Sequence, residues 1–444
     1  MTVELSGHYG YRRILRTMLP MVAMMLVTSI YTIVDGFFIS NFAGSTPFAA
    51  MNIIWPALSI LSAVGLMIGA GGSALISKLL GEGRKQKASE TFTMLTCLSF
   101  AAGAVMAAVV IIFMKPICIA LGAEGDMIPY AVQYGRIIAL ALPFYLLQME
   151  NHSFYMTAER PHLGTLISII CGVTNIALDA IFVVWFGWGL TGAAVATSIA
   201  LVFGGLFPII YFSSSNNDTH LHYTGPRKVD WKSLGKACTN GLSEYVSNIA
   251  LNIIGICYNL QLMKFIGEDG VSAYGIIIYI GFIFGAVFIG YNMGISQVIA
   301  YNYGAGNKAE LRSLLRKSLL LIGLCEIMLT AAAELTAPLL ARAFVGYDAE
   351  LTALSTHATR IYMLSFLLCG VNMFASAWFT ALNNGTVSAV AAFTRTLVFE
   401  MAAVFALPAL VGIDGIWYAV SVAESLAFIL SISLILAYRR RYGY

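Results

Sequence analysis

Charge is the scarcest feature of this sequence. Only 11% of its 444 residues are Asp, Glu, Lys or Arg, whereas 59% are hydrophobic, and the mean hydropathy is +0.82. An average soluble domain carries roughly 25% charged residues, so this composition excludes a soluble globular protein. The net charge of +3 is small and follows from membrane topology, so we expect no nucleic-acid partner.

Motifs for catalysis and metal binding are also missing. The seven cysteines are scattered singly without a CxxC pair, and the six histidines form no HExxH motif and no cluster. The glycine-rich string GAGGSA at 69–74 lacks the GKS/T ending of a phosphate-binding loop. We therefore expect no enzymatic activity and no cofactor, and we expect an ion gradient to supply the energy for any work.

Long apolar runs take the place of the missing charge. A hydrocarbon core about 30 Å thick is crossed by a helix of about 20 apolar residues. We predict twelve such helices, at 13–41, 49–79, 88–114, 127–156, 162–185, 190–213, 233–265, 271–302, 310–341, 351–382, 386–411 and 415–438. The first is too long for a signal-peptide core and lacks a cleavage pattern, so we expect it to be retained.

Lys and Arg gather in the loops of one side. If the N-terminus is in the cytoplasm, the basic loops, which include Arg84, Lys85, Arg227 and Lys228, lie on the cytoplasmic side. Only Lys115, Lys264 and Arg342 then lie on the outer side of the membrane. Because cytoplasmic loops carry the excess of positive charge, we predict a multi-pass plasma-membrane protein with both termini in the cytoplasm.

The chain divides into two similar halves. The only long polar segment, 214–232, separates six predicted helices in 1–213 from six in 233–444. A shift of 223 positions aligns Gly44 with Gly267, Gly71 with Gly294, Gly81 with Gly304 and Gly83 with Gly306. Because each half has an even number of helices, both halves have the same topology. We predict two six-helix lobes related by a pseudo-two-fold axis along the membrane normal.

Acids inside the predicted helices are the main candidates for function. Asp35 follows Tyr31 by four residues, and Asp179 follows Asn175 by four, so each pair shares a helical face. A carboxylate in hydrocarbon costs at least about 2.5 kcal/mol on insertion scales and by default marks a functional site. The alternative is that both acids are structural, each hydrogen-bonded to a neighbouring helix.

Asp35 and Asp179 are expected to lie at the same depth in the membrane. Counting from Arg16 and Pro161 at about 1.5 Å per residue, Asp35 and Asp179 lie roughly 27 to 29 Å from the cytoplasmic side. Tyr134 and Thr197 follow the outer ends of their helices by seven or eight residues, which is the same level.

Such a group has the chemistry of an ion site. Two carboxylates, a carboxamide oxygen and hydroxyls are hard-oxygen ligands for a small cation, and paired carboxylates can also hold a proton. At the repeat offset Asp35 matches Tyr258 and Asp179 matches Ala402, so the acid pair is not duplicated. We therefore expect cation coupling in the N-terminal lobe alone.

Further charges lie in other predicted helices. Glu244 is a candidate for substrate or cation contact, and Arg395 and Glu400 are candidates for substrate contact or charge pairing. Mutual pairing is the simplest explanation for the intramembrane arginines. The remaining members of this set are Arg136, Glu326, Arg360 and Glu424.

The strings YTIVDGFFISNFAG, MIGAGGSALISKLLGEG, TNIALDAIFVVWFGWGLTGAAVATSIA and GISQVIAYNYGAGNKAE together give a family resemblance. The chain resembles, over its whole length, the multidrug and toxic compound extrusion (MATE) family, in its bacterial MepA-like and DinF-like branch. The resemblance implies a twelve-helix, two-lobe antiporter that exports amphipathic, cationic drugs in exchange for Na+ or H+ and so contributes to antibiotic resistance. It implies cation binding by Asp35, Asn175 and Asp179, with Tyr31, Tyr134 and Thr197 as further lining residues.

Our functional prediction is therefore a cation-coupled multidrug exporter that works by alternating access, as a monomer in the lipid bilayer. One alternative is a flippase for lipid-linked oligosaccharides, which would need a cationic cavity; Arg136, Arg360 and Arg395 leave this possibility open. A second alternative, an intramembrane enzyme, would need a nucleophile and a base, and the sequence offers no such constellation.

Overall fold

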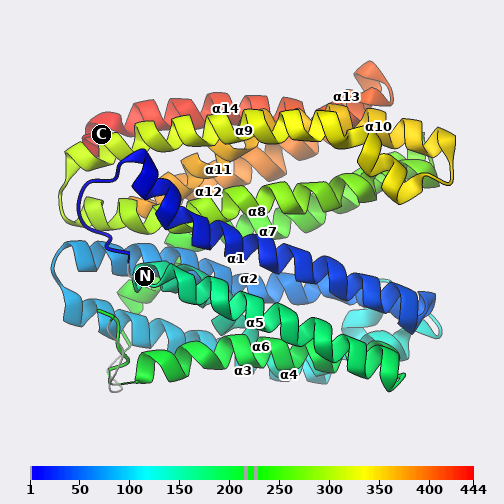
Figure 1. Ribbon diagram of the computed structural model, residues 1–444, viewed down its shortest axis with the longest axis horizontal. Coiled ribbons are helices and arrows are strands. Elements are labelled where there is room, and N and C mark those ends of the chain that lie inside the picture. The colour runs from blue at the N-terminus through cyan, green and yellow to red at the C-terminus, as the bar shows by residue number, and fades with distance from the viewer. Residues whose placement is uncertain (1–2, 215–218, 225–228) are drawn as a thin grey trace.

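The computed structural model describes residues 3–214, 219–224 and 229–444, and within these residues all regular structure is helical (Figure 1). Residues 215–218 and 225–228 of the polar segment 214–232, which include Arg227 and Lys228, lie outside the described residues. The α-helices are α1 (Tyr11–Phe38), α2 (Ser45–Gly81), α3 (Lys85–Ala120), α4 (Met127–Thr157), α5 (Pro161–Asp179), α6 (Gly189–Ser213), α7 (Trp231–Phe265), α8 (Glu268–Gly304), α9 (Lys308–Val345), α10 (Ala349–Met363), α11 (Phe366–Ala381), α12 (Gly385–Phe393), α13 (Met401–Val411) and α14 (Asp414–Tyr442). Three π-helical segments continue α1, α5 and α12, namely η1 (Ile39–Ala43), η2 (Ala180–Trp185) and η3 (Thr394–Glu400).

Eleven helical segments of the described residues are long and apolar enough to cross a membrane, and α10 and α11 meet the same criteria when taken together, which gives eleven to twelve candidate spans. The helices extend beyond the predicted apolar runs; for example, 88–114 lies within Lys85–Ala120. Polar turns at the helix ends remain helical, so counting apolar residues underestimates the length.

The helix predicted over 351–382 is divided in the structure into α10 and α11. The chain bends there by 43° between α10 and α11. At the bend, Leu364 N–H bonds to the Ile361 carbonyl and Ser365 N–H to the Tyr362 carbonyl, a tighter turn than the α-helix. Neither proline nor glycine lies at this turn, so the sequence carries no breaker that would have indicated it.

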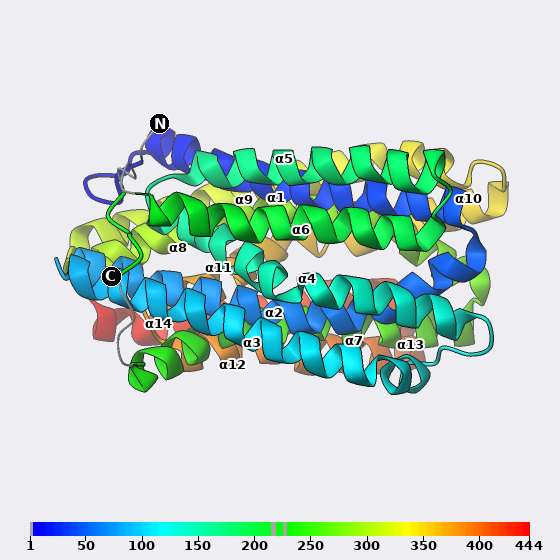
Figure 2. The same cartoon turned by 90° about the horizontal axis from the view of Figure 1, so that it is seen from below.

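The helices run side by side along the long axis, and both termini lie at one end of the molecule, here named the termini end (Figure 1). In the first half, α4 packs against α2, α3 and α6, while α5 packs against α1 and α6, as the view from below also shows (Figure 2). In the second half, α9 packs against α10 and α11, and α14 packs against α11 and α13. The two halves meet through α1 with α8 and α2 with α7.

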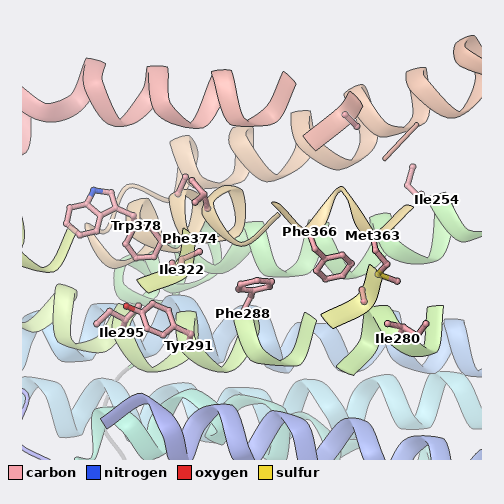
Figure 3. Close-up of a cluster of buried hydrophobic side chains, with 14 of the residues drawn as sticks. Ile254, Ile280, Phe288, Tyr291, Ile295, Ile322, Met363, Phe366, Phe374 and Trp378 are labelled. Carbon is pink, nitrogen blue, oxygen red and sulfur yellow. The ribbon is translucent and has the colours of Figure 1, made fainter. Parts of the chain in front are cut away.

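The second half has an aromatic core. Phe288 of α8 faces Phe366 of α11, with ring centroids 6.4 Å apart, and Phe374 lies 5.9 Å from Trp378 (Figure 3). These side chains are buried together with Ile322 of α9. The cluster fixes the position of α11 after the bend.

Glycines bring the backbones of the two halves into direct contact. A Cβ on Gly81 would collide with the carbonyl of Tyr301, and a Cβ on Gly304 would collide with the carbonyl of Lys78. Each residue of one contact lies 223 positions from its counterpart in the other, so the contacts are equivalent under the repeat. We call Gly71, Gly81, Gly241, Gly294 and Gly304 the interface glycines.

The same reciprocity appears one level further from the termini end. Gly71 of α2 lies against Ala237 and Gly241 of α7, and Gly294 of α8 lies against Met18 of α1. The equivalent of Gly71 at the repeat offset is Gly294, and that of Gly241 is Met18. The interface glycines therefore form a pseudo-symmetric set of close contacts, in which Gly294 meets the Met18 side chain and the other four meet backbone atoms.

An N-terminal strap, residues 3–10, crosses from one half to the other at the termini end. Val3 N–H donates to the backbone carbonyl of Glu159 (3.0 Å) and Leu5 N–H donates to its carboxylate (2.8 Å). Tyr9 N–H donates to the Glu310 carboxylate (2.8 Å), and Lys317 Nζ donates to the Tyr9 carbonyl (2.6 Å). The strap thus ties the turn after α4 to the first turns of α9.

Glu310→Gln is expected to lower the free energy of unfolding by about 1 to 3 kcal/mol, because the buried Tyr9 N–H loses a charged acceptor. Thermal unfolding of the purified protein in detergent measures the change. Glu350→Gln is the matched control, since Glu350 also lies in the first turn of a helix but is exposed. Equal melting temperatures for the two variants would contradict a stabilising role for the strap.

Candidate cation-binding site

Four helices of the first half contribute polar groups to one site. Asp35 lies near the end of α1, Asn175 and Asp179 lie in the last two turns of α5, Thr197 lies in α6 and Tyr134 in α4. The carboxyl groups of Asp35 and Asp179 lie within hydrogen-bond range of each other, and the Thr197 hydroxyl lies within range of Asp35. The structure therefore brings together side chains that are separated by up to 162 residues in the sequence.

Burial makes the charge of this site costly. Asp179 is 0% exposed and Asn175 is 1% exposed, while Asp35 is half-buried. The π-helical segment η2 begins directly after Asp179. Such segments are frequent at functional sites, where the altered backbone turn redirects neighbouring side chains.

Several oxygens here lack a hydrogen-bond donor in the described part of the chain. Asn175 donates through Nδ2 to the Thr197 hydroxyl (3.3 Å), which leaves its Oδ1 as an acceptor. That Oδ1, both carboxylate oxygens of Asp179 and Oδ1 of Asp35 are buried and receive no hydrogen bond from a donor among the described residues. Two facing carboxyls need a shared proton or a bound cation to compensate their repulsion. The donor set therefore fits Na+ or a proton.

The two tyrosines both lie close to the site. Tyr134 is 1% exposed, has a buried hydroxyl without a hydrogen-bond partner among the described residues, and interacts electrostatically with Asp35 and Asp179. Tyr31 packs its ring on Gly172 of α5 and interacts electrostatically with Tyr145 and Asp35. Both tyrosines thus adjoin the acids, and Tyr31 also supports the contact between α1 and α5.

The equivalent position in the second half is filled by an aromatic side chain. Tyr258, which matches Asp35 at the repeat offset, is fully buried and stacks on Tyr274 with ring centroids 4.8 Å apart. Its hydroxyl faces the backbone of Val420, the counterpart of Thr197. No acid of the second half occupies the place of Asp35 or Asp179.

The charged groups of the second half form a separate network. Arg395 donates through Nη2 and Nε to Glu424 of α14 (2.7 and 2.9 Å to Oε1), and Asn372 donates to the other Glu424 oxygen (2.6 Å). Glu400 interacts electrostatically with Arg395, while Glu424 on the neighbouring helix forms the ion pair. Glu244 of α7 is half-buried and also interacts with Arg395.

The other intramembrane arginines lie elsewhere. Arg360 Nε is 3.7 Å from Glu334, and both side chains are partly exposed. Arg136 donates through Nε to the Ile111 carbonyl (3.2 Å) in an exposed contact. Arg395 and Arg360 therefore each lie beside an acid, as predicted, whereas Arg136 binds a backbone carbonyl.

Glu424→Gln is expected to destabilise the protein by about 3 kcal/mol, the lower end of the range for breaking a buried pair. The reason is that the half-buried Arg395 guanidinium loses its paired carboxylate and keeps only the more distant Glu400 and Glu244. The melting temperature of purified protein reports the change. Glu124→Gln, in an exposed loop, is the control. The double variant Glu424→Gln with Arg395→Gln should recover part of the loss; a single variant as stable as wild type would refute the pairing argument.

One buried acid had not been singled out from the sequence. Glu150 of α4 is 0% exposed, and neither of its carboxylate oxygens has a hydrogen-bond partner among the described residues. The signal was available, because Glu150 lies in the polar run Gln148–Ser153 inside an otherwise apolar helix. Glu150 lies near the end of α4 opposite to Tyr134, so a shared depth with Asp35 does not indicate it.

Comparisons with known proteins agree with this architecture. The family model described as MatE matches residues 20–181 and 245–405. The chain is 24% identical over 433 residues to "Multidrug export protein MepA" of Staphylococcus haemolyticus (strain JCSC1435), covering 97% of this chain and 94% of that protein. It has the same identity and coverage with the MepA protein of Staphylococcus aureus (strain MSSA476).

Solved structures are similar over nearly the whole length. A crystal structure of a MATE protein in complex with MaL6 superposes with a TM-score of 0.91 at 22% identity, covering 98% of both chains. A multidrug resistance MATE transporter of the MOP superfamily, in an outward-facing conformation, also gives a TM-score of 0.91, at 23% identity, covering 99% of this chain and 97% of the other. These similarities confirm the predicted all-helical membrane fold.

Proposed function

The chain belongs to the MatE family of membrane transporters, and from this premise we propose that it is a secondary active multidrug exporter that exchanges Na+ or protons for amphipathic, cationic organic compounds. It is a multi-pass membrane protein, and we place it in the plasma membrane with both termini in the cytoplasm, acting as a monomer. The finding that carries the proposal is the buried carboxyl pair Asp35 and Asp179, whose oxygens lack donors among the described residues.

The carboxyl pair supplies a binding switch. A cation entering from outside binds Asp35 and Asp179 with the free Oδ1 of Asn175 and removes their mutual repulsion. Because α1 and α5 carry these acids, occupancy changes how closely the two helices pack. Drug is then released outward, the loaded protein rearranges, and the cation is discharged to the cytoplasm.

The substrate class follows from charge and from the relatives. The relatives in Staphylococcus are named multidrug export proteins. Glu244 and Glu400 are half-buried acids of the second half, and they offer negative charge to a cationic compound. The 19 methionines and 26 phenylalanines supply adaptable apolar surface, and aromatic rings attract cations.

A flippase for lipid-linked oligosaccharides receives little support. Such a protein needs free cationic groups in its cavity to bind a pyrophosphate. The Arg395 guanidinium is neutralised by Glu424, Arg360 lies near Glu334, and Arg136 binds a backbone carbonyl at an exposed position. The three arginines that left this alternative open are thus engaged elsewhere.

Reconstitution in liposomes tests the proposal. Liposomes that contain the purified protein are loaded with a fluorescent organic cation. A sodium gradient and a pH gradient are then imposed separately. We expect efflux in response to at least one gradient, and the effective gradient identifies the coupling ion. Efflux that responds to neither would remove the antiporter proposal.

A further inference from the structure

A second buried carboxyl lies in the first half, far from Asp35 and Asp179. Glu150 is seven residues from the end of α4 and sixteen residues beyond Tyr134 on the same helix, which corresponds to about 24 Å. It is 0% exposed and forms no ion pair with the described residues. An isolated buried carboxylate is costly, and such groups are paired or bind a cation.

Hydroxyl groups lie near this carboxyl. The Ser99 hydroxyl of α3 lies beside it, and Thr96 lies one turn away on the same helix. Tyr223 interacts electrostatically with Glu150, and its hydroxyl lies within hydrogen-bond range of Thr96. The hydroxyl oxygens of all three residues are buried and lack a partner of standard geometry among the described residues. With the two carboxylate oxygens of Glu150, they make a set of hard-oxygen ligands.

The segment 219–224 covers the group from the termini end. Leu221 is fully buried, and the Tyr223 ring stacks on Phe92 with centroids 5.0 Å apart. Thr224 N–H donates to the Thr93 hydroxyl (3.0 Å), and Ser89 donates to the His220 carbonyl (3.2 Å). A residue of the connection between the two halves thereby enters the packed interior of the first half.

We propose that Glu150, Ser99, Thr96 and Tyr223 form a second site for a monovalent cation, Na+ or a proton, near the termini end of the first half. The single carboxylate matches a single positive charge, and the hydroxyls complete the shell without adding charge. Because Tyr223 belongs to the connecting segment, an occupied site also holds 219–224 in place. This site is separate from the coupling site and does not depend on the proposed drug export.

The test measures cation binding directly in the purified full chain. Asp35→Asn provides the background, so that the coupling site is weakened and the Glu150 site is observed. In this background we expect either saturable binding of radioactive sodium or an infrared carbonyl band of a protonated carboxylic acid. Adding Glu150→Gln is expected to remove one bound sodium per protein or one component of the carbonyl band, whereas adding Glu124→Gln in an exposed loop is expected to leave both unchanged. Sodium binding identifies Na+, and the infrared band identifies a proton.

Tyr223→Phe gives a second variant that retains the stack on Phe92. It removes one ligand oxygen, so we expect about tenfold weaker sodium binding or a shifted carboxylic-acid band. If Glu150→Gln does not fold, this variant alone decides the question. Sodium binding and infrared spectra that are unchanged in every folded variant would overturn the proposal. Efflux in liposomes is measured separately, so a failure of the export proposal is distinguishable from a failure of this one.

Discussion

Asp35→Asn is expected to reduce gradient-driven efflux to the level of protein-free liposomes. The substitution removes one of two negative charges that would hold the cation. At a separation of about 4 Å and an effective dielectric near 20, one such interaction is worth about 4 kcal/mol, or about a thousandfold in affinity. Asp179→Asn should have the same effect, because its carboxyl faces that of Asp35.

The control is Asp126→Asn. Asp126 is exposed, lies just before α4 and makes no side-chain capping hydrogen bond. It should transport like wild type. If Asp35→Asn also transported like wild type under an imposed gradient, the acid would be structural and coupling would have to reside elsewhere.

The second large effect concerns contact between the two halves. Gly71→Ala is expected to destabilise the protein by about 3 kcal/mol, the upper part of the range for overpacking, and to impair transport. The new methyl group would collide with the Ala237 carbonyl and the Gly241 N–H, which are backbone atoms of α7. Backbone atoms cannot turn aside as a flexible side chain can, so α7 as a whole must move away from α2.

Gly255→Ala is the control. Gly255 lies on α7, the helix that Gly71 of α2 contacts, and a Cβ at Gly255 meets nothing within 4 Å. Alanine also favours a helix over glycine by about 1 kcal/mol, so this variant should be as stable as wild type or more stable. Melting temperature and liposome efflux are measured for both variants. Equal behaviour of Gly71→Ala and Gly255→Ala would show that the close backbone contact is dispensable.

Local pattern and helix geometry were sufficient to predict much of the first half. Counting residues from the helix ends placed Asp35 and Asp179 at one depth, and the structure brings their carboxyls within hydrogen-bond range. This works because straight helices with a known rise convert sequence position into depth. The role of these acids in coupling stays a prediction, whereas the family resemblance and the all-helical membrane fold are confirmed.

Other features depend on partners that no single segment reveals. The bend between α10 and α11 has no proline or glycine, and directly after it Phe366 packs against Phe288 of α8. Arg395 pairs with Glu424 rather than with Glu400, its neighbour in sequence, because α14 lies beside η3. Glu150 acquires its surroundings from α3 and from Tyr223, 73 residues away. Such contacts arise only when the helices are assembled.

The reciprocal packing of the interface glycines has a consequence for the symmetry of the molecule. Gly81 meets Tyr301 as Gly304 meets Lys78, so position i of one half touches position j of the other, and the converse also holds. This is the contact rule of a symmetric homodimer. The two six-helix halves thus face each other as the subunits of such a dimer do. This pairing is kept at the interface glycines, although Asp35 and its counterpart Tyr258 differ in chemistry.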